Sequence, residues 1–251
     1  MSLVRAPLIL LHAILYQLAS TPPNKTPSNG RYDATEAPWI RIAPLVFKMQ
    51  QPLVWLCTSA DILLILSHHL PIPALRSSLQ AVLCPAAPAS ASPFIRPTLP
   101  FFTGLALVAA GTLLRLTCYR SLGPFFTFDL ALLPKHQLVT SGPYRFVRHP
   151  AYAGSLLILA GLGLADLSPG GWIAECVSAG AGPAPSPRSS SLFSSVSMLW
   201  AWAVFAVWYA WWLAVGVRRA RMEDAALREA FGKQWTEYAG RVRWWFFPGV
   251  L

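Results

Sequence analysis

The residues of this chain whose types could support chemistry gather in one short segment, residues 136–152, with the sequence HQLVTSGPYRFVRHPAY. The segment holds two arginines, two histidines and two tyrosines, and it lies between two apolar runs long enough to cross a membrane. Charged groups beside a bilayer are costly, and those that persist there usually serve a function. The pattern therefore predicts a reaction centre at the mouth of a membrane domain.

A second group of polar residues follows the last apolar run. Residues 217–232 predict a helix, and Gly232 is a natural C-terminal stop for it. Arg219 and Glu223 are four residues apart, so they share one face of that helix. Taken alone, an ordinary ion pair on an interfacial helix is the simpler interpretation. A functional role for the pair is favoured if residues 136–152 lie on the same side of the membrane.

The run Arg148-His149-Pro150 by itself indicates the start of a helix. Proline favours the first position of a helix, so Pro150 predicts the start of the fourth apolar helix. The residues before it would then lie near a helix N-terminus, where backbone N–H groups favour an anion. An alternative stays open, in which Arg148 and His149 only anchor the helix at the lipid headgroups.

The composition predicts a lipid-embedded fold. Of the 251 residues 55% are apolar and only 12% are charged, against about 25% charged in an average globular domain. The apolar runs are close to the length of about 20 residues that crosses a bilayer. We therefore expect one all-α domain over residues 1–251, a polytopic membrane helical bundle of about five spans, at residues 3–19, 53–70, 99–119, 151–167 and 196–217. The first run could instead be a cleaved signal, and a retained span is the favoured interpretation.

The basic residues predict the orientation of these spans. Sixteen of the 20 Lys and Arg residues fall at the connections after the first and third runs and in the tail. The positive-inside rule places those connections in the cytosol, so the elements at 125–152 and 218–248 would face the cytosol together. Topology also accounts for the net charge of +10, and without stacking aromatics in a basic groove no nucleic-acid partner is expected.

The remaining connections predict little chemistry. Six prolines between residues 71 and 97 predict a non-helical link. Residues 168–195, rich in Gly, Ala, Ser and Pro, predict a flexible lumenal loop. The cysteines show no metal-ligand spacing, so no metal site is expected. Cys84 and Cys176 both fall on the lumenal side, where a disulfide could form, although two free thiols are the preferred interpretation.

The two polar groups together resemble a known family. Residues 138–152, with Gly142-Pro143-Tyr144 and Arg148-His149-Pro150, followed by Arg219-x-x-x-Glu223, look like the isoprenylcysteine carboxyl methyltransferases. Those are membrane enzymes of the endoplasmic reticulum that use S-adenosylmethionine to methylate the C-terminal carboxylate of prenylated proteins. The resemblance is firm over residues 125–152 and 218–248, and the N-terminal half matches in hydropathy only. Membrane methyltransferases that act on phospholipid amines share the Arg-His-Pro element and the acidic helix.

The resemblance implies a role for each matching residue and no metal. Arg219 would face the substrate carboxylate, in a position to orient it for the reaction. Two departures stand out: the acidic run is only Glu223-Asp224, and residues 168–195 have no counterpart. The residues implied in cofactor binding are His136, Gln137, Leu138, Val139 and Tyr144 lining the S-adenosylmethionine site, Arg148, His149, Pro150 and Ala151 holding the amino-acid portion of the cofactor, Glu223, and Asp129.

Three alternatives to this activity remain open at the level of the sequence. A carboxylate acceptor is ionised at pH 7 and needs no general base, whereas a phospholipid amine must lose a proton. A membrane sterol or lipid reductase would use a nicotinamide cofactor, for which the chain has no glycine-rich fingerprint. A lipid-binding or scaffolding protein would bind no cofactor. Prenylated proteins are the implied partners, and membrane lipid would admit their prenyl chains.

Overall fold

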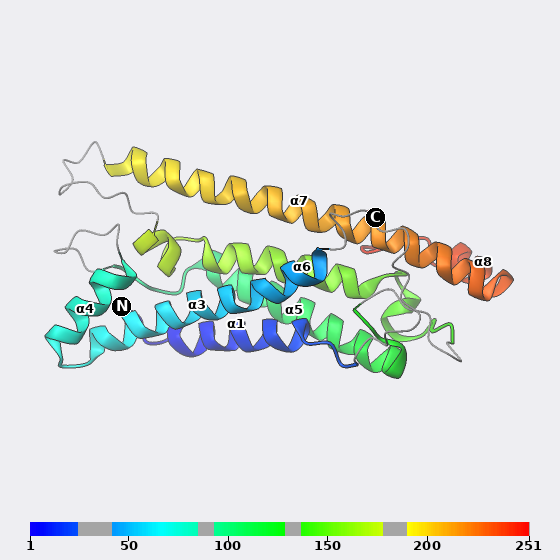
Figure 1. Cartoon of the computed structure of the whole chain (residues 1–251), viewed down its shortest axis with the longest axis horizontal. Helices are drawn as coiled ribbons and strands as arrows, with labels where there is room; N and C mark the ends of the chain where they lie inside the picture. Colours follow the sequence, from blue (N-terminus) through cyan, green and yellow to red (C-terminus); the bar gives the residue numbers. More distant parts are fainter. Residues whose placement is uncertain (25–41, 85–92, 129–136, 178–189, 251) are drawn as a thin grey trace. The chain divides into compact units, whose positions relative to one another are not determined.

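A computed structural model of the chain describes residues 1–24, 42–84, 93–128, 137–177 and 190–250. These residues form helices and turns, with no β-strand among them, which confirms the all-α prediction. The helices in chain order are α1 (Arg5–Ser20), α3 (Ala43–His69), α4 (Pro73–Leu83), α5 (Leu99–Leu122), α6 (Pro150–Asp166), α7 (Ser190–Phe231) and α8 (Lys233–Arg241) (Figure 1).

Each of the five predicted apolar runs lies largely within one helix, α1, α3, α5, α6 or α7. In the described part of the chain, three segments are long and apolar enough to cross a membrane, namely Lys48–His69, Leu99–Phe125 and Val196–Phe231. Helix α6 is apolar but has 17 residues, and α1 has 16. The membrane-helical class is thus supported, and the count of five spans stays a prediction.

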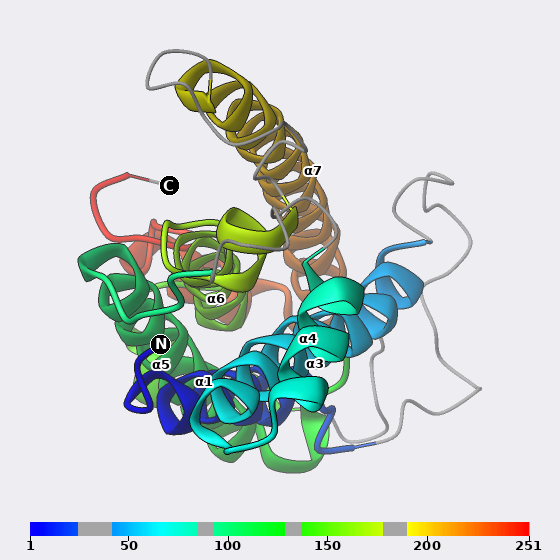
Figure 2. The ribbon, with the colours of Figure 1, turned by 90° about the vertical axis from the view of Figure 1, so that its left-hand side faces the viewer.

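Two helices differ from the sequence-based expectation, and each contains a proline. The link over residues 71–97 contains α4, which Figure 2 shows following the C-terminal end of α3. Pro73 occupies the start of α4, where its missing N–H costs nothing, so it begins a helix instead of preventing one. Helix α3 also begins at Ala43, ten residues before the predicted run, and passes through Pro52 without ending.

The chain divides into two compact units. The first consists of residues 1–16, 51–109 and 159–209, and the second of residues 17–50, 110–158 and 210–251. The first unit thus collects the N-terminus and the connections on either side of α4 and after α6. The second collects the connections after α1 and α5 together with the tail. The counting of basic residues had sorted the connections into the same two groups.

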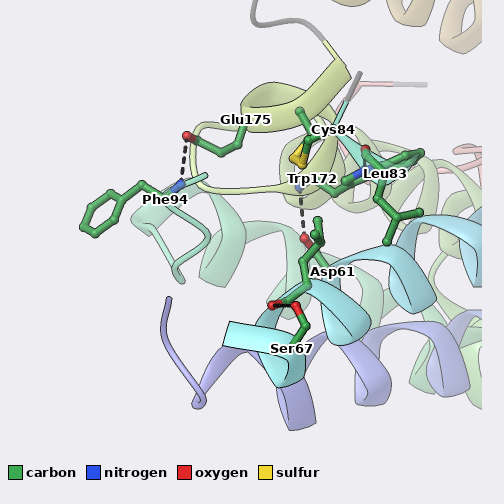
Figure 3. The surroundings of a disulfide bond; sticks show 9 residues. Asp61, Ser67, Leu83, Cys84, Phe94, Trp172 and Glu175 are labelled. Atoms are coloured by element: carbon green, nitrogen blue, oxygen red, sulfur yellow. Dashed lines mark hydrogen bonds between the residues drawn. A yellow bond between two sulfur atoms is a disulfide. The ribbon is translucent and has the colours of Figure 1, made fainter. Parts of the chain in front are cut away.

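Polar contacts tie the connections of the first unit together. Buried Arg5 donates to Asp61 over 3.0 Å, and the other carboxylate oxygen of Asp61 accepts the backbone N–H of Trp172. The indole N–H of Trp172 donates to the carbonyl of Leu83, at the end of α4, over 2.7 Å. Figure 3 shows Asp61, Trp172 and Leu83 of this arrangement beside the bonded Cys84.

Cys84 and Cys176 form a disulfide bond, so the preference for two free thiols was wrong. The sequence placed both cysteines on one side of the membrane but could not bring the ends of α4 and the π-helix Ile173–Val177 into contact. A covalent bond can join the two connections only if they lie on the same side. The disulfide thus agrees with the charge-based grouping, and disulfides persist in oxidising compartments.

The predicted loop over residues 168–195 is shorter in the structure. Its first part carries the π-helix Ile173–Val177, and Glu175 of that helix accepts hydrogen bonds from the backbone N–H groups of Phe94 and Gly170. Helix α7 begins at Ser190. The abundance of Gly, Ala, Ser and Pro overstated the loop, because composition does not reveal hydrogen bonds such as those of Glu175.

In the second unit, small residues bring α5 and α6 together. A Cβ at Gly111 would lie 2.5 Å from the carbonyl oxygen of Gly154, so these positions require glycine. Buried Arg115 of α5 donates to the carbonyl oxygens of Ala19 and Ala151, over 2.9 and 3.2 Å. The first turn of α6, which follows the Arg-His-Pro run, is thereby held against α5.

Candidate functional site

Two backbone hydrogen bonds hold the Arg-His-Pro run against the C-terminal segment. The N–H of Arg148 donates to the carbonyl of Trp244 over 2.9 Å, and the N–H of His149 donates to the carbonyl of Trp245 over 2.8 Å. Helix α6 then begins at Pro150, as the sequence predicts. The two side chains are thus fixed from both directions, by a helix start and by the C-terminal segment.

The acidic pair of α7 meets these side chains. The Nδ1 and Nε2 atoms of the His149 ring lie 3.1 Å from Glu223 and 2.7 Å from Asp224. Arg148 donates to the second oxygen of Asp224 over 2.6 Å. The hydroxyl of Tyr152, in the first turn of α6, donates to Glu223. Two cations and two carboxylates therefore form one compact cluster, which we call the Arg-His/Glu-Asp cluster (Arg148, His149, Glu223 and Asp224).

The cluster holds His149 as an imidazolium. Burial by itself lowers the pKa of this histidine, but the hydrogen bonds to Asp224 and Glu223 outweigh it and raise the pKa to about 9. Both ring nitrogens then donate, so neither is available to accept a proton. These contacts favour an orienting group over a general base at His149.

Stability should depend on pH through this histidine. Its pKa in the folded protein is above its ordinary value of about 6.5. The stabilisation is therefore complete below about pH 6.5, and it is lost as the pH rises through about 9. We expect the free energy of unfolding to fall by on the order of 3 kcal/mol across this window. Denaturation at a series of pH values measures the fall, and a His149→Gln variant with an equally steep profile would contradict it.

Asp224 is the residue that sequence reasoning missed. It accepts hydrogen bonds from Arg148, from His149 and, over 3.1 Å, from the indole N–H of Trp245. The side chain of Trp245 also lies beneath the guanidinium of Arg221, 5.7 Å from it. The adjacent acidic pair is the only signal for Asp224 in the sequence, and the resemblance assigns this residue no role.

Six further residues are predicted to bind the cofactor, and the structure describes four of them: Gln137, Leu138, Val139 and Tyr144. Tyr144 is buried, and its carbonyl accepts the hydroxyl of Tyr238 from α8 over 2.7 Å. Leu138 packs on the cluster around Trp235, Val139 packs on the cluster that contains Tyr144, and Gln137 is exposed. The structure thus gathers these residues in the second unit, and the predicted His136 and Asp129 lie outside the described residues.

Arg219 lies one turn before Glu223 on α7. Its guanidinium donates to the carbonyl of Phe128 over 2.9 Å. The ring of Phe128 in turn lies 5.1 Å from the guanidinium of Arg115. The hydroxyl of Tyr152 donates to Glu223, one turn after Arg219 on α7. Two arginines therefore approach Phe128, and one of them, Arg219, lies one turn of α7 from the Arg-His/Glu-Asp cluster.

The sequence of this chain is similar to those of known methyltransferases. The family model described as phospholipid methyltransferase matches residues 99–179, which include the Arg-His-Pro run. The resemblance to isoprenylcysteine methyltransferases is confirmed. The chain is 30% identical over 141 residues to protein-S-isoprenylcysteine O-methyltransferase B of Arabidopsis thaliana, which covers 55% of each protein.

Rice relatives give the same result. The chain is 27% identical over 143 residues to a probable protein-S-isoprenylcysteine O-methyltransferase of Oryza sativa subsp. indica, covering 56% of this chain and 58% of the relative. A protein of the same name from subsp. japonica matches equally well. The chain thus spans little more than half the length of the curated relatives it matches.

Proposed function

We propose that this protein transfers a methyl group from S-adenosylmethionine to the C-terminal carboxylate of prenylated cysteine in proteins. The observation that carries the proposal is the Arg-His/Glu-Asp cluster beside Arg219. The names of the relatives support methyl transfer as the reaction. Because the chain covers about half of those relatives, the acceptor rests on the site itself.

The cluster has groups that fit the amino-acid portion of the cofactor. The Nε atom of Arg148 is buried and has no hydrogen-bond partner among the described residues, so it can donate to a carboxylate. Glu223 is the more exposed of the two acids, with 27% of its side chain accessible against 12% for Asp224. Glu223 can therefore accept an ammonium group while Asp224 holds Arg148 and His149 in place.

These contacts suggest a role for each residue of the site. S-adenosylmethionine would supply an electrophilic methyl group when bound. Arg148 and Glu223 would bind its charged end, and Gln137, Leu138, Val139 and Tyr144 would line the remainder. Pro150 and Ala151 would contribute backbone at the start of α6. Arg219 would hold the acceptor carboxylate, because a guanidinium binds carboxylates through two parallel hydrogen bonds and stays charged.

The state of His149 favours a carboxylate acceptor over an amine. A carboxylate with a pKa near 3.5 is already ionised at pH 7, so methylating it requires no base. A phospholipid amine must give up a proton, and the histidine of the cluster has both nitrogens engaged by acids. The phospholipid amine remains the second candidate, since the matching family model carries that description.

The membrane setting suits a lipidated acceptor. Each buried CH₂ of a prenyl chain contributes about 0.8 kcal/mol to partition into lipid, so the acceptor would reach the protein through the bilayer. We propose the endoplasmic reticulum membrane as the location and the cytosol as the side that the site faces. The distribution of basic residues supports that orientation.

Two substitutions test the assignment. Arg219→Ala should lose turnover, on the order of a hundredfold or more as for other positioning groups, and largely keep cofactor binding. Glu223→Ala should weaken cofactor binding. Isothermal titration with S-adenosylmethionine separates the two effects, and Glu237→Ala, which removes an exposed carboxylate of α8, is the matched control. Unchanged activity in both variants would refute the assignment.

Labelled cofactor identifies the acceptor. The purified protein is given radiolabelled S-adenosylmethionine with either a farnesylated cysteine analogue or phosphatidylethanolamine. Label in a base-labile methyl ester supports the proposal, and label in the phospholipid assigns the amine acceptor instead. Failure to bind the cofactor at all would point to a reductase or to a non-enzymatic lipid-binding protein.

A further inference from the structure

The segment that carries Arg148 and His149 also presents an exposed surface that the proposed function does not use. Phe146 is 65% exposed and Trp244, on the C-terminal segment paired with it, is 41% exposed. Arg145 and Arg243 beside them are exposed too. We call these four residues the paired surface. Exposed aromatic residues next to cations match a partner that is both apolar and anionic.

The charged side chains of the two segments that form the paired surface are all positive. Residues 141–148 and 239–250 contain four arginines and no aspartate or glutamate. Arg148 is engaged by Asp224, while Arg145, Arg241 and Arg243 are exposed. A partner of negative charge is therefore complementary to the paired surface.

The position of the paired surface identifies that partner as lipid. Phe146 lies four residues before Pro150, where the apolar helix α6 begins. Where α6 enters a bilayer, Phe146 and Trp244 come to the level of the headgroups, the depth at which tryptophan is enriched. An acidic protein would match the charge but not the apolar helix that starts beside the paired surface.

We propose that the paired surface binds anionic phospholipid headgroups and thereby steadies the Arg-His-Pro run. The coupling is direct, because the backbone N–H groups of Arg148 and His149 donate to Trp244 and Trp245. The guanidinium of Arg148 also donates to the carbonyl of Arg243 over 3.2 Å. Lipid that holds residues 243–245 in place also holds the acceptors of these hydrogen bonds.

Amide hydrogen exchange of the full chain in nanodiscs tests the proposal without any methyl acceptor. The exchange of the Arg148 and His149 amides is compared in discs of phosphatidylcholine and in discs that also contain phosphatidylserine. Each arginine near an anionic surface contributes about a fivefold change in an equilibrium constant. We therefore expect up to about 30-fold slower exchange with phosphatidylserine, and we expect added salt to reverse it.

Charge variants test whether the paired surface causes the response to phosphatidylserine. Arg145→Gln combined with Arg243→Gln should exchange like the wild type in phosphatidylcholine and should not respond to phosphatidylserine. Arg228→Gln combined with Lys233→Gln removes two exposed charges from α7 and α8 and should keep the full response. Equal exchange in both kinds of disc overturns the proposal, as does a control that loses the response. Slower exchange caused by an acidic peptide in phosphatidylcholine discs alone would assign the paired surface to a protein partner and also overturns it.

Discussion

Replacing Asp224 by alanine is expected to lower the free energy of unfolding by about 3 to 5 kcal/mol and to abolish binding of S-adenosylmethionine. The buried carboxylate accepts hydrogen bonds from Arg148, His149 and Trp245. Its removal leaves a guanidinium and an imidazolium facing each other with one acid fewer, and an unpaired buried charge is far more costly than the lost pair was favourable. The same three contacts join α7 to the start of α6 and to the C-terminal segment, so the cluster should lose its shape.

Thermal unfolding in detergent and isothermal titration measure the two effects. Asp224→Glu keeps the charge and should recover part of both, and Asp224→Asn keeps the shape alone and should remain defective. The matched control is Glu237→Gln on α8, whose partner Lys233 is 3.8 Å away and largely exposed, so its loss should cost less than about 1 kcal/mol. If Asp224→Ala bound the cofactor as tightly as the wild type, the cluster would have no part in the site.

The helices could be predicted because their signals are local. The start of α6 at Pro150 and the end of α7 before Gly232 depend on backbone preferences of single residues, and both appear where expected. Gly232 has a φ of 52°, a conformation that favours glycine. The same local rule failed at Pro73, since a proline that ends one helix and a proline that begins another look alike in sequence.

Contacts between distant segments could not be predicted. The sequence placed residues 136–152 and the Arg219/Glu223 helix on one side of the membrane, and the structure gathers their described residues in one unit. The sequence did not indicate that one carboxylate, Asp224, would accept hydrogen bonds from both Arg148 and His149. Nor could it show that both nitrogens of His149 are engaged, which decides between a base and an orienting group. Such information depends on side-chain positions across 75 residues of chain.

The pairing of Cys84 with Cys176 illustrates the same limit. Charge counting placed both cysteines on one side, so a disulfide was allowed, but allowed pairs outnumber those that form. The structure adds Trp172, which donates to Asp61 and to the carbonyl of Leu83, the residue before Cys84. These hydrogen bonds bring the end of α4 to the π-helix, and no pattern in the sequence predicts them.

In the first unit, Asp61→Ala is expected to destabilise the protein by about 3 to 5 kcal/mol, whereas Arg5→Met combined with Asp61→Leu should recover most of that loss. Arg5 is fully buried and its guanidinium is 2.9 Å from Asp61. Removing the acid alone strands a cation among apolar neighbours such as Phe101, whose ring centroid is 4.2 Å away. Removing both charges leaves an apolar pair of similar volume.

The recovery should be incomplete, because two backbone groups also depend on these side chains. Arg5 donates to the carbonyl of Arg96, and Asp61 accepts the N–H of Trp172; each lost hydrogen bond costs about 1 kcal/mol. Thermal unfolding of the wild type, both single variants and the double variant in one detergent gives the coupling between the two charges. A double variant as unstable as Asp61→Ala would mean that the backbone contacts, and not the stranded cation, dominate. Since α1 carries Arg5 and α3 carries Asp61, the size of the coupling measures how strongly one ion pair holds the two helices together within this unit.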